Sequence, residues 1–297
     1  MNIQAWWIAV RPKTLIVSIA PVFLGVALAY NDNPNQVNWI IGLLTLIAAV
    51  LIQIGTNLVN DVYDFIKGAD NHDRLGPMRV TQSGLLSEKK VKKGAFLCFF
   101  LALLIGIYLV YQGGLIILLI GSFALISGYC YTAGPYPLAY NGLGDLFVFI
   151  FFGLIAVPGT YYLQSGILFS TESILIGSAI GFIAVAILCI NNIRDIESDK
   201  KVGKKTLAVR FGKKPIIFLY DLMILLPYIC IGILFFNKNG LFFFDLTLYL
   251  LLLSVPVAIS LIIDIHNKQN KELNNILIRT ALFMRIYFML LIIGIVL

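Results

Sequence analysis

Apolar residues run through this chain in long stretches that are separated by short polar connections. Each stretch has about the 17–25 residues that a helix needs to cross the hydrocarbon core of a bilayer. The pattern predicts an all-α polytopic membrane protein with nine transmembrane helices, and no polar linker divides residues 1–297 into separate domains. The stretches occupy residues 14–30, 38–66, 94–111, 114–132, 143–163, 173–193, 215–236, 246–264 and 277–296.

The charged residues lie mostly between these stretches and on one side of the expected membrane. Only 12% of the residues are charged, against roughly 25% in an average soluble domain. Lys and Arg concentrate in segments 67–93, 194–214 and 264–279, and basic segments stay on the cytoplasmic side. We therefore expect a multi-pass protein of the cell (inner) membrane, with a cytoplasmic N-terminus and an extracytoplasmic C-terminus. The net charge of +7 either attracts membrane lipids and an anionic substrate or only sets this topology.

Cysteine and histidine give no sign of a metal or redox centre. Each of the four cysteines stands alone in an apolar stretch, without a CxxC pair. His72 and His266 are far apart in the sequence. We expect small molecules and membrane lipids as partners, and no nucleic acid.

Two clusters of Asn and Asp interrupt the apolar pattern at the ends of the second and sixth predicted helices. A charged side chain near hydrocarbon costs at least about 2.5 kcal/mol, so several in one place indicate a functional site. At about 100° per residue, each cluster forms one polar stripe on its helix. Neither stripe can face lipid, so we expect the two to face each other across a cavity. The clusters are Asn57, Asn60, Asp61 and Asp64, and Asn191, Asp195 and Asp199.

The residue types in these clusters suit a magnesium ion that is bound together with a phosphorylated substrate. Mg²⁺ prefers oxygen ligands and usually takes one or two carboxylates, with substrate phosphate and water completing its shell. Basic residues beside the clusters would neutralise the charge of a departing diphosphate. We expect the metal ligands to be Asn60, Asp61, Asp64, Asn191, Asp195 and Asp199, and the phosphate-binding cations to include Lys67, Arg79, Arg194 and Lys204.

Two other interpretations of the clusters stay open at this point. Asp and Asn at helix ends are often solvated caps. An ion-coupled transporter also places carboxylates inside the membrane, but its binding site lies near the midplane, where broken helices meet. In this chain the polar residues collect at one face, and no broken helix pair is evident in the sequence.

Several motifs resemble those of the UbiA-type intramembrane aromatic prenyltransferases, and the resemblance covers nearly the whole chain. Within the family the similarity is greatest to the branch that acts on 1,4-dihydroxy-2-naphthoate. The general family pattern Asn-x3-Asp-x3-Asp ends here at Gly68, and Asp61 or Asp70 would take the role of its last Asp. The motifs are Arg11-Pro12-Lys13-Thr14-Leu15, and the segments 57–70, 76–84, 151–162 and 191–207.

The resemblance implies nine transmembrane helices around a central cavity that opens toward the cytoplasmic side. It also implies a Mg²⁺-dependent enzyme that joins the polyprenyl group of a polyprenyl diphosphate to an aromatic acceptor. In the naphthoate branch the reaction includes loss of CO₂ and gives demethylmenaquinone, in menaquinone biosynthesis. The alternative acceptors are 4-hydroxybenzoate, homogentisate and haem.

Roles for individual residues also follow from the resemblance. Near the fifth predicted helix, Tyr140 and Asp145 either orient the aromatic acceptor or cap the helix. The residues with an implied catalytic role are Asp61, Asp64, Asp195 and Asp199. The residues expected to bind substrates are Asn57, Asn60, Lys67, Asp70, Arg79, Tyr140, Asp145, Asn191, Asn192, Arg194 and Lys204.

Overall fold

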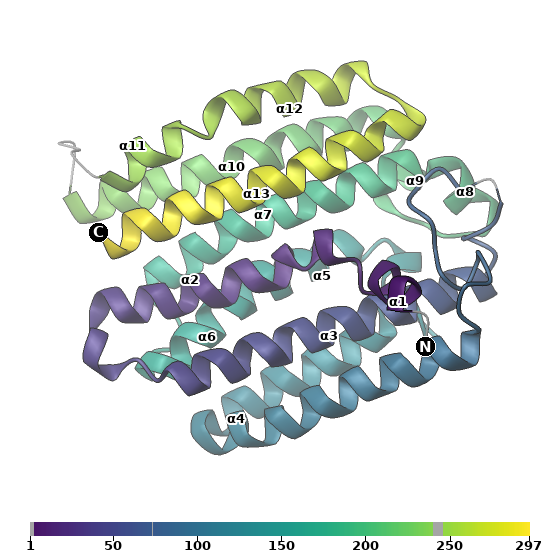
Figure 1. Cartoon of the computed structure of the whole chain (residues 1–297). Coiled ribbons are helices and arrows are strands. Elements are labelled where there is room, and N and C mark those ends of the chain that lie inside the picture. Colours follow the sequence, from purple (N-terminus) through teal and green to yellow (C-terminus); the bar gives the residue numbers. More distant parts are fainter. Residues whose placement is uncertain (1–2, 73, 240–245) are drawn as a thin grey trace.

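The computed structural model describes residues 3–72, 74–239 and 246–297, which fold into helices joined by short connections (Figure 1). Within these ranges no strand occurs, as expected for a chain whose backbone groups must be bonded inside each segment when lipid surrounds it. The α-helices are α1 (Ile3–Val10), α2 (Ile16–Asp32), α3 (Trp39–Ile66), α4 (Glu88–Cys130), α5 (Gly144–Phe149), α6 (Ala156–Ser165), α7 (Thr171–Arg194), α8 (Ile196–Lys201), α9 (Leu207–Phe211), α10 (Lys213–Asn239), α11 (Leu246–Leu252), α12 (Val255–Asn267) and α13 (Leu273–Val296). The shorter turns are η1 (Pro12–Thr14), η2 (Pro34–Gln36), η3 (Ala139–Asn141), η5 (Asn270–Glu272) and the π-helix η4 (Ile150–Ile155).

The described residues contain seven helices that are long and apolar enough to cross a membrane, or eight with one bent pair. The bent pair joins α1 and η1 to α2 at an angle of 53°. The predicted span 14–30 corresponds to α2, which begins at Ile16. The apolar pattern does not indicate α1 as a helix of its own, because its eight residues are too few to span a bilayer.

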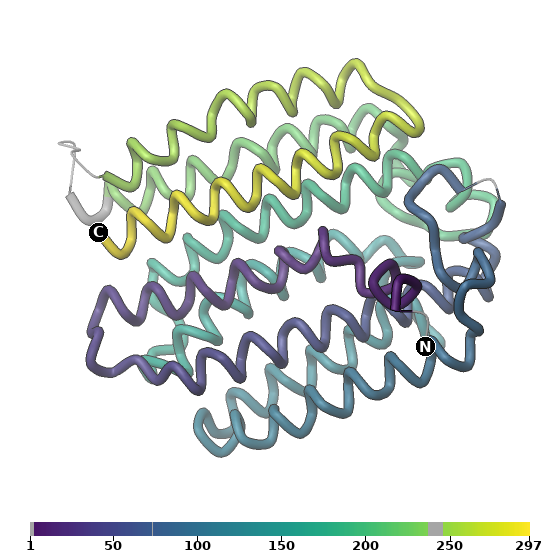
Figure 2. Tube along the Cα trace, in the orientation of Figure 1, coloured from purple at the N-terminus to yellow at the C-terminus, as the bar shows by residue number. Residues whose placement is uncertain are grey.

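Helix α4, of 43 residues, contains two helical arms that correspond to the predicted helices 94–111 and 114–132, although the first arm begins earlier, at Glu88. The backbone leaves the helical region at Gly114, with φ 64° and ψ −153°. Only glycine adopts this conformation without strain, since it has no Cβ atom. The Cα trace doubles back near this point, so that α4 forms two arms (Figure 2).

The buried centre of the molecule is α7, which packs against α10, α13, α2 and η4. Small residues allow the closest of these contacts. A Cβ atom on Gly177 would lie 2.2 Å from the Gly153 carbonyl oxygen of η4, and one on Gly181 would lie 2.7 Å from the Gly153 Cα atom. Such contacts between helix backbones are how membrane helices gain packing energy without a hydrophobic driving force.

The polar ends of α3 and α7 lie at the same end of the bundle (Figure 1). The connection 67–87 follows α3 there, and α8 and α9 follow α7. Helix α1 packs on α3 at this end, with Ala5 and Ala9 buried and the Trp6 ring against Gly94. The fold therefore brings two segments about 130 residues apart to one place, as expected for facing stripes.

Candidate functional site

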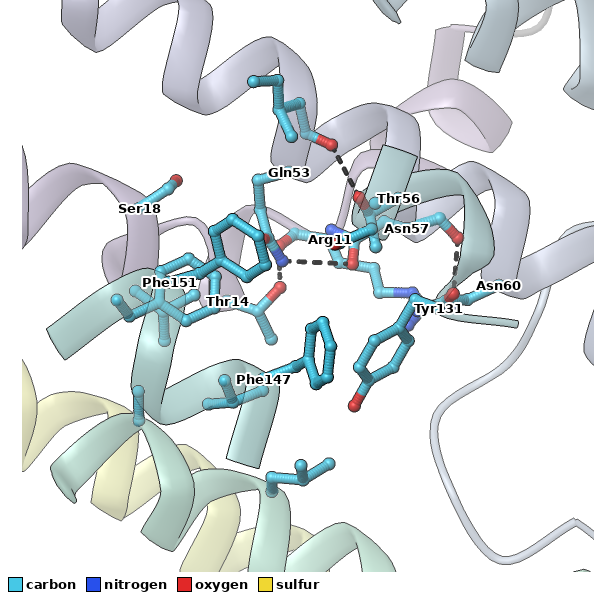
Figure 3. Close-up of a pocket in the computed structure, with 18 of the residues that line it drawn as sticks. Arg11, Thr14, Ser18, Gln53, Thr56, Asn57, Asn60, Tyr131, Phe147 and Phe151 are labelled. Atoms are coloured by element: carbon cyan, nitrogen blue, oxygen red, sulfur yellow. Dashed lines mark hydrogen bonds between the residues drawn. The ribbon is translucent and has the colours of Figure 1, made fainter. Parts of the chain in front are cut away.

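A cavity of about 980 Å³ lies between the helices, with wall residues from α1 to α8 and from α13. Its lining includes Asp64 near the end of α3 and Asp199 of α8, and the apolar Leu109 and Ile117 beside the Gly114 turn. Figure 3 shows part of the lining, in which Asn57 and Asn60 of α3 lie across from aromatic rings. The cavity thus has a polar end and an apolar interior.

The first cluster supplies Asp64, which is 4% exposed and faces the cavity. Its Oδ1 accepts a hydrogen bond of 2.9 Å from the Tyr140 hydroxyl, and its Oδ2 lies 3.9 Å from Nη2 of Arg79. Asp70, also buried, forms ion pairs with Arg74 and Arg79. The carboxylates of α3 and of the following connection are therefore held among cations.

Gly68 makes this placement of Asp70 possible. Its φ of 78° lies in the left-handed region, where glycine commonly ends a helix. The amides of Ala69 and Asp70 then donate to the carbonyl oxygen of Asp64, at 2.8 Å and 3.1 Å. The chain turns back over the end of α3, and Asp70 lines the cavity two residues after the position where the family pattern has its last Asp.

Asp61 lies differently from its neighbours in the first cluster. It is 1% exposed and does not line the cavity. Its Oδ2 and Oδ1 accept hydrogen bonds from the amides of Val80 and Thr81, at 3.1 Å and 2.9 Å. This geometry favours a role in holding the loop that carries Arg79, and of the two candidates left open by the sequence it favours Asp70 for contact with a ligand.

The second cluster uses the residues that end α7 and form α8. Asp195 makes a two-pronged pair with the adjacent Arg194, at 2.8 Å and 2.7 Å. Asp199, one turn later, lies 3.4 Å from Nζ of Lys204. Arg194 also donates to Asn274 of α13, which ties the end of α7 to that helix.

Lys204 connects the two clusters. Its Nζ lies 3.4 Å from Asp199 Oδ1 and 3.9 Å from Asp64 Oδ1. Since Asp64 belongs to α3 and Asp199 to α8, one ammonium group bridges carboxylates of both clusters. The structure thus brings the two polar stripes together at the cavity wall.

Burial sets the electrostatics of this end of the cavity. It raises the pKa of Asp70 to about 7 and the pKa of Asp199 to about 6. Burial alone would lower the pKa of Lys204, but Asp64 and Asp199 outweigh it and the pKa is raised. The cluster therefore carries a persistent positive charge beside carboxylates that lose protons near neutral pH.

The donor set of this site fits a magnesium ion that is shared with a substrate. The two clusters offer the carboxylate oxygens of Asp and the amide oxygens of Asn, without sulfur or imidazole. In the described part of the chain no three Asp, Glu, His or Cys side chains already form a metal cage. Arg79 Nε lies 3.1 Å from Asp70 Oδ2, yet both atoms are buried without an aligned hydrogen bond. The free Asp70 oxygen suits Mg²⁺, which usually binds through few carboxylates and substrate phosphates, and the free Arg79 donors suit a phosphate oxygen.

The remaining predicted residues divide between the wall of the cavity and its support. Asn57, Asn60, Asn191 and Asn192 line the cavity, and Asp145 lies with them. Lys67 and Tyr140 stand behind the wall. Lys67 donates to the Thr132 carbonyl oxygen at 2.7 Å, and its Nζ lies 4.2 Å from the centre of the Tyr140 ring.

Arg11 and Phe151 belong to sequence motifs but had no assigned role, and the sequence did not indicate Tyr131 or Phe147 as individual cavity residues. Arg11 has a left-handed backbone (φ 56°), and its guanidinium donates to the Asn57 carbonyl oxygen at 3.4 Å. The rings of Tyr131, Phe147 and Phe151 project toward the cavity (Figure 3). The sequence signal for Arg11 was its motif ahead of the first span, and the signal for Phe151 was the motif 151–162. Tyr131 and Phe147 had no such signal, because Phe and Tyr are common in membrane helices.

Comparison with known proteins agrees with this architecture. The model of the UbiA prenyltransferase family matches residues 18–291. The 1,4-dihydroxy-2-naphthoate octaprenyltransferases of Haemophilus influenzae and Escherichia coli are 42% and 40% identical to this chain over 71% of its length, and over 70% and 69% of their own. A solved UbiA homologue from Archaeoglobus fulgidus, bound to DMAPP and Mg²⁺, has a TM-score of 0.59 at 18% identity, over 96% of this chain and 98% of that one. The resemblance drawn from the motifs is confirmed, and the chain belongs to the UbiA prenyltransferase family.

Proposed function

We propose that this protein transfers a polyprenyl group from polyprenyl diphosphate to 1,4-dihydroxy-2-naphthoate, with loss of CO₂ and diphosphate, to give demethylmenaquinol, the reduced form of demethylmenaquinone. The names of the relatives from Haemophilus influenzae and Escherichia coli support this acceptor. The cavity supports it independently, because its polar end suits a diphosphate and its apolar remainder suits an isoprenoid chain.

The observation that carries the proposal is the position of Lys204 between Asp64 and Asp199. A diphosphate placed there meets Lys204 and the unpaired donors of Arg79. Mg²⁺, when bound by the carboxylates of both clusters and by the diphosphate, would offset the negative charge that grows on the leaving group. We place Asp64, Asp70, Asp195 and Asp199, with Asn60 and Asn191, around that ion.

The chemistry assigned to the protein's own side chains is binding and charge stabilisation. Arg79 and Lys204 would hold the diphosphate while the bond between its oxygen and the allylic carbon breaks. The rings of Phe147, Phe151 and Tyr131 would face the positive charge left on the allylic carbon, as aromatic faces attract cations. The electron-rich acceptor ring then attacks that carbon.

We further propose nine transmembrane spans, with the cavity opening toward the cytoplasm. Both arms of α4 count as spans in this proposal, because 43 residues are about 65 Å long, roughly twice the hydrocarbon thickness. The basic segments 67–93 and 194–214 support a cytoplasmic mouth. A cysteine introduced as Lys205→Cys should react with a membrane-impermeant maleimide only from the cytoplasmic side, and labelling from outside alone would contradict this orientation.

The function is tested with the purified protein in lipid nanodiscs, supplied with Mg²⁺, a polyprenyl diphosphate and one candidate acceptor at a time. We expect prenylated product and CO₂ with 1,4-dihydroxy-2-naphthoate, and neither without Mg²⁺. Lys204→Gln should lower the rate by about 100-fold or more, as loss of a group that stabilises transition-state charge does. Lys205→Gln, the exposed neighbour, should stay within about threefold of the original rate. Product with only 4-hydroxybenzoate, homogentisate or haem, or ion flux in liposomes without product, would contradict the proposal.

A further inference from the structure

Asp145 differs from every other carboxylate that lines the cavity. Asp64, Asp70, Asp195 and Asp199 each have a Lys or Arg nitrogen within 4.0 Å. Asp145 is 8% exposed, and among the described residues no basic nitrogen comes within that distance of it. A buried charge without a countercharge is expensive, so a carboxylate kept in this state indicates a function.

The side-chain partners of Asp145 are neutral and distant. The amide nitrogen of Asn192 lies 3.4 Å and 3.5 Å from its two oxygens, and Sγ of Cys189 lies 4.0 Å from Oδ1. Both residues belong to α7. A carboxylate offers about four lone-pair positions, so Asp145 has acceptor capacity left for a donor that enters the cavity.

The surroundings of Asp145 suit a flat aromatic molecule. Phe147 follows two residues later, and its ring packs with Phe123 and Phe151, at centroid distances of 5.8 Å from Phe123 and 6.2 Å from Phe151. On another side, a Cβ atom on Gly144 would lie 2.9 Å from the Tyr131 hydroxyl, so this hydroxyl is close to the start of α5. Figure 3 shows Tyr131 and Phe147 facing the same space.

We propose that Asp145 is the catalytic base that accepts the proton of the acceptor hydroxyl next to the attacked carbon, while Asn192 orients its carboxylate. The proposal rests on the proposed function, since it needs a hydroxylated aromatic acceptor. It separates two tasks within one cavity. The cation-paired carboxylates serve the diphosphate, and the carboxylate without a cation serves the ring.

The proton and electrons balance within this step. The hydroxyl proton moves to Asp145, the ring carbon that carries the carboxylate forms a bond to the allylic carbon, and the allylic C–O bond breaks with its electron pair on the diphosphate. The ring now holds a ketone beside a quaternary carbon that bears the carboxylate. Loss of CO₂ returns an electron pair to the ring, and Asp145 gives the proton back to the oxygen. No oxidant or reductant is needed.

The first test compares Asp145→Asn with Asp221→Asn, which makes the same change on α10, outside the cavity. We expect Asp145→Asn to lower kcat by about 100-fold or more, the usual size of general-base catalysis. Binding of geranyl diphosphate with Mg²⁺, measured by calorimetry, should stay within about threefold of the original affinity, because the diphosphate side is untouched. A kcat within about threefold of the original, or an equal loss of diphosphate binding, would overturn the proposal.

Dependence on pH distinguishes a base from a purely structural residue. The ratio of the original kcat to the kcat of Asp145→Asn should fall as the pH rises toward the pKa of the acceptor hydroxyl, because an ionised hydroxyl needs no base. The other titratable groups around Asp145 are Cys189 on α7 and Tyr131 after α4. Cys189→Ala should therefore keep the shape of the pH profile, and a deficit of Asp145→Asn that is constant with pH would count against the proposal.

A test on the unaltered protein keeps the proposal falsifiable if Asp145→Asn does not fold. The acceptor whose hydroxyl beside the carboxylate is methylated has no proton to give. It should compete with 1,4-dihydroxy-2-naphthoate for binding but yield no product. Its prenylation at a similar rate would overturn the role of Asp145 while leaving the proposed function intact. Absence of product from the unmodified acceptor would instead contradict the proposed function.

Discussion

The two acidic clusters reach the same cavity by different means. In the cluster at the end of α3, both oxygens of Asp61 accept hydrogen bonds from backbone amides of a loop distant in sequence. The glycine turn at Gly68 places Asp70 in the cavity wall. In the cluster after α7, Asp195 is held by its own neighbour Arg194, and Asp199 follows by one helical turn. The first cluster is built by tertiary structure and the second by helix periodicity.

Carboxylates with the same spacing in the sequence can therefore have different roles, in structure or in ligand binding. Asp61 is bonded to buried backbone amides and does not line the cavity. Asp64, Asp195 and Asp199 line the cavity and contact cations that a phosphate can also contact.

The largest effect should come from the cavity carboxylates. Asp64→Ala, Asp70→Asn and Asp199→Asn should each lower prenyl transfer by about 1,000-fold, as expected when a ligand of an essential metal is lost. Each variant also leaves a buried Lys or Arg without its partner, so the folded fraction is measured together with turnover. Turnover and size-exclusion profiles measure both quantities, with Asp221→Asn as the matched control. Near-normal turnover of Asp70→Asn would contradict its assignment as a metal ligand and would favour Asp61 instead.

Asp61→Asn should act mainly on stability. An amide in place of the carboxylate brings an NH₂ group against the amide of Val80 or Thr81, which leaves buried donors unsatisfied and lowers the free energy of unfolding by about 2–3 kcal/mol. The thermal midpoint should fall, while the Mg²⁺ concentration that gives half-maximal activity stays unchanged in the folded fraction. If that concentration rises tenfold or more, by about 1.4 kcal/mol, Asp61 acts on the metal after all.

Stability and metal binding should depend on pH in opposite directions. The folded pKa values of Asp70 and Asp199, raised by burial from 3.8 to about 7 and about 6, lie above their unfolded values. Protonation of Asp70 and Asp199 therefore stabilises the metal-free fold. This contribution to the free energy of unfolding is fully present below the unfolded pKa and is lost as the pH rises through the folded pKa values. Mg²⁺ binds the ionised forms, so its affinity should weaken as the pH falls from about 7.5 to about 5.5. Thermal midpoints with and without Mg²⁺ measure this, and a shift independent of pH would contradict it.

The smallest effect should come from Gly68→Ala. A side chain at a φ of 78° costs about 1–2 kcal/mol, although the nearest atom, in Val202, leaves room for the methyl group at 3.7 Å. The strain should displace Asp70 and raise the Mg²⁺ requirement modestly. Gly203→Ala, which has a similar φ of 71° and open space, is the control for strain alone. Equal effects of both variants on the Mg²⁺ requirement would show that the turn at Gly68 has no special part.

The hydrophobic pattern predicts most of the helix ranges, and the positions of Asn and Asp predict both clusters, because these signals are local in the sequence. The stripe at Asp195 and Asp199 follows from helix geometry alone. The separate role of Asp61 could not be derived, since it depends on the amides of a loop some 20 residues away that only the tertiary structure brings near. For the same reason the sequence did not predict the contact of Arg11 with Asn57, or that Asp145 has no cation beside it.

The contact between Gly153 and the glycines of α7 has a mechanical consequence for the cavity. Backbone atoms touch there without intervening side chains, so this wall is stiff and yields to a bulky ligand only by moving whole helices. Helix α4 is less enclosed: 17% of its most apolar 18-residue stretch is buried, against 72% for α7. We therefore expect α4, rather than α7, to shift when isoprenoid chains of different length bind.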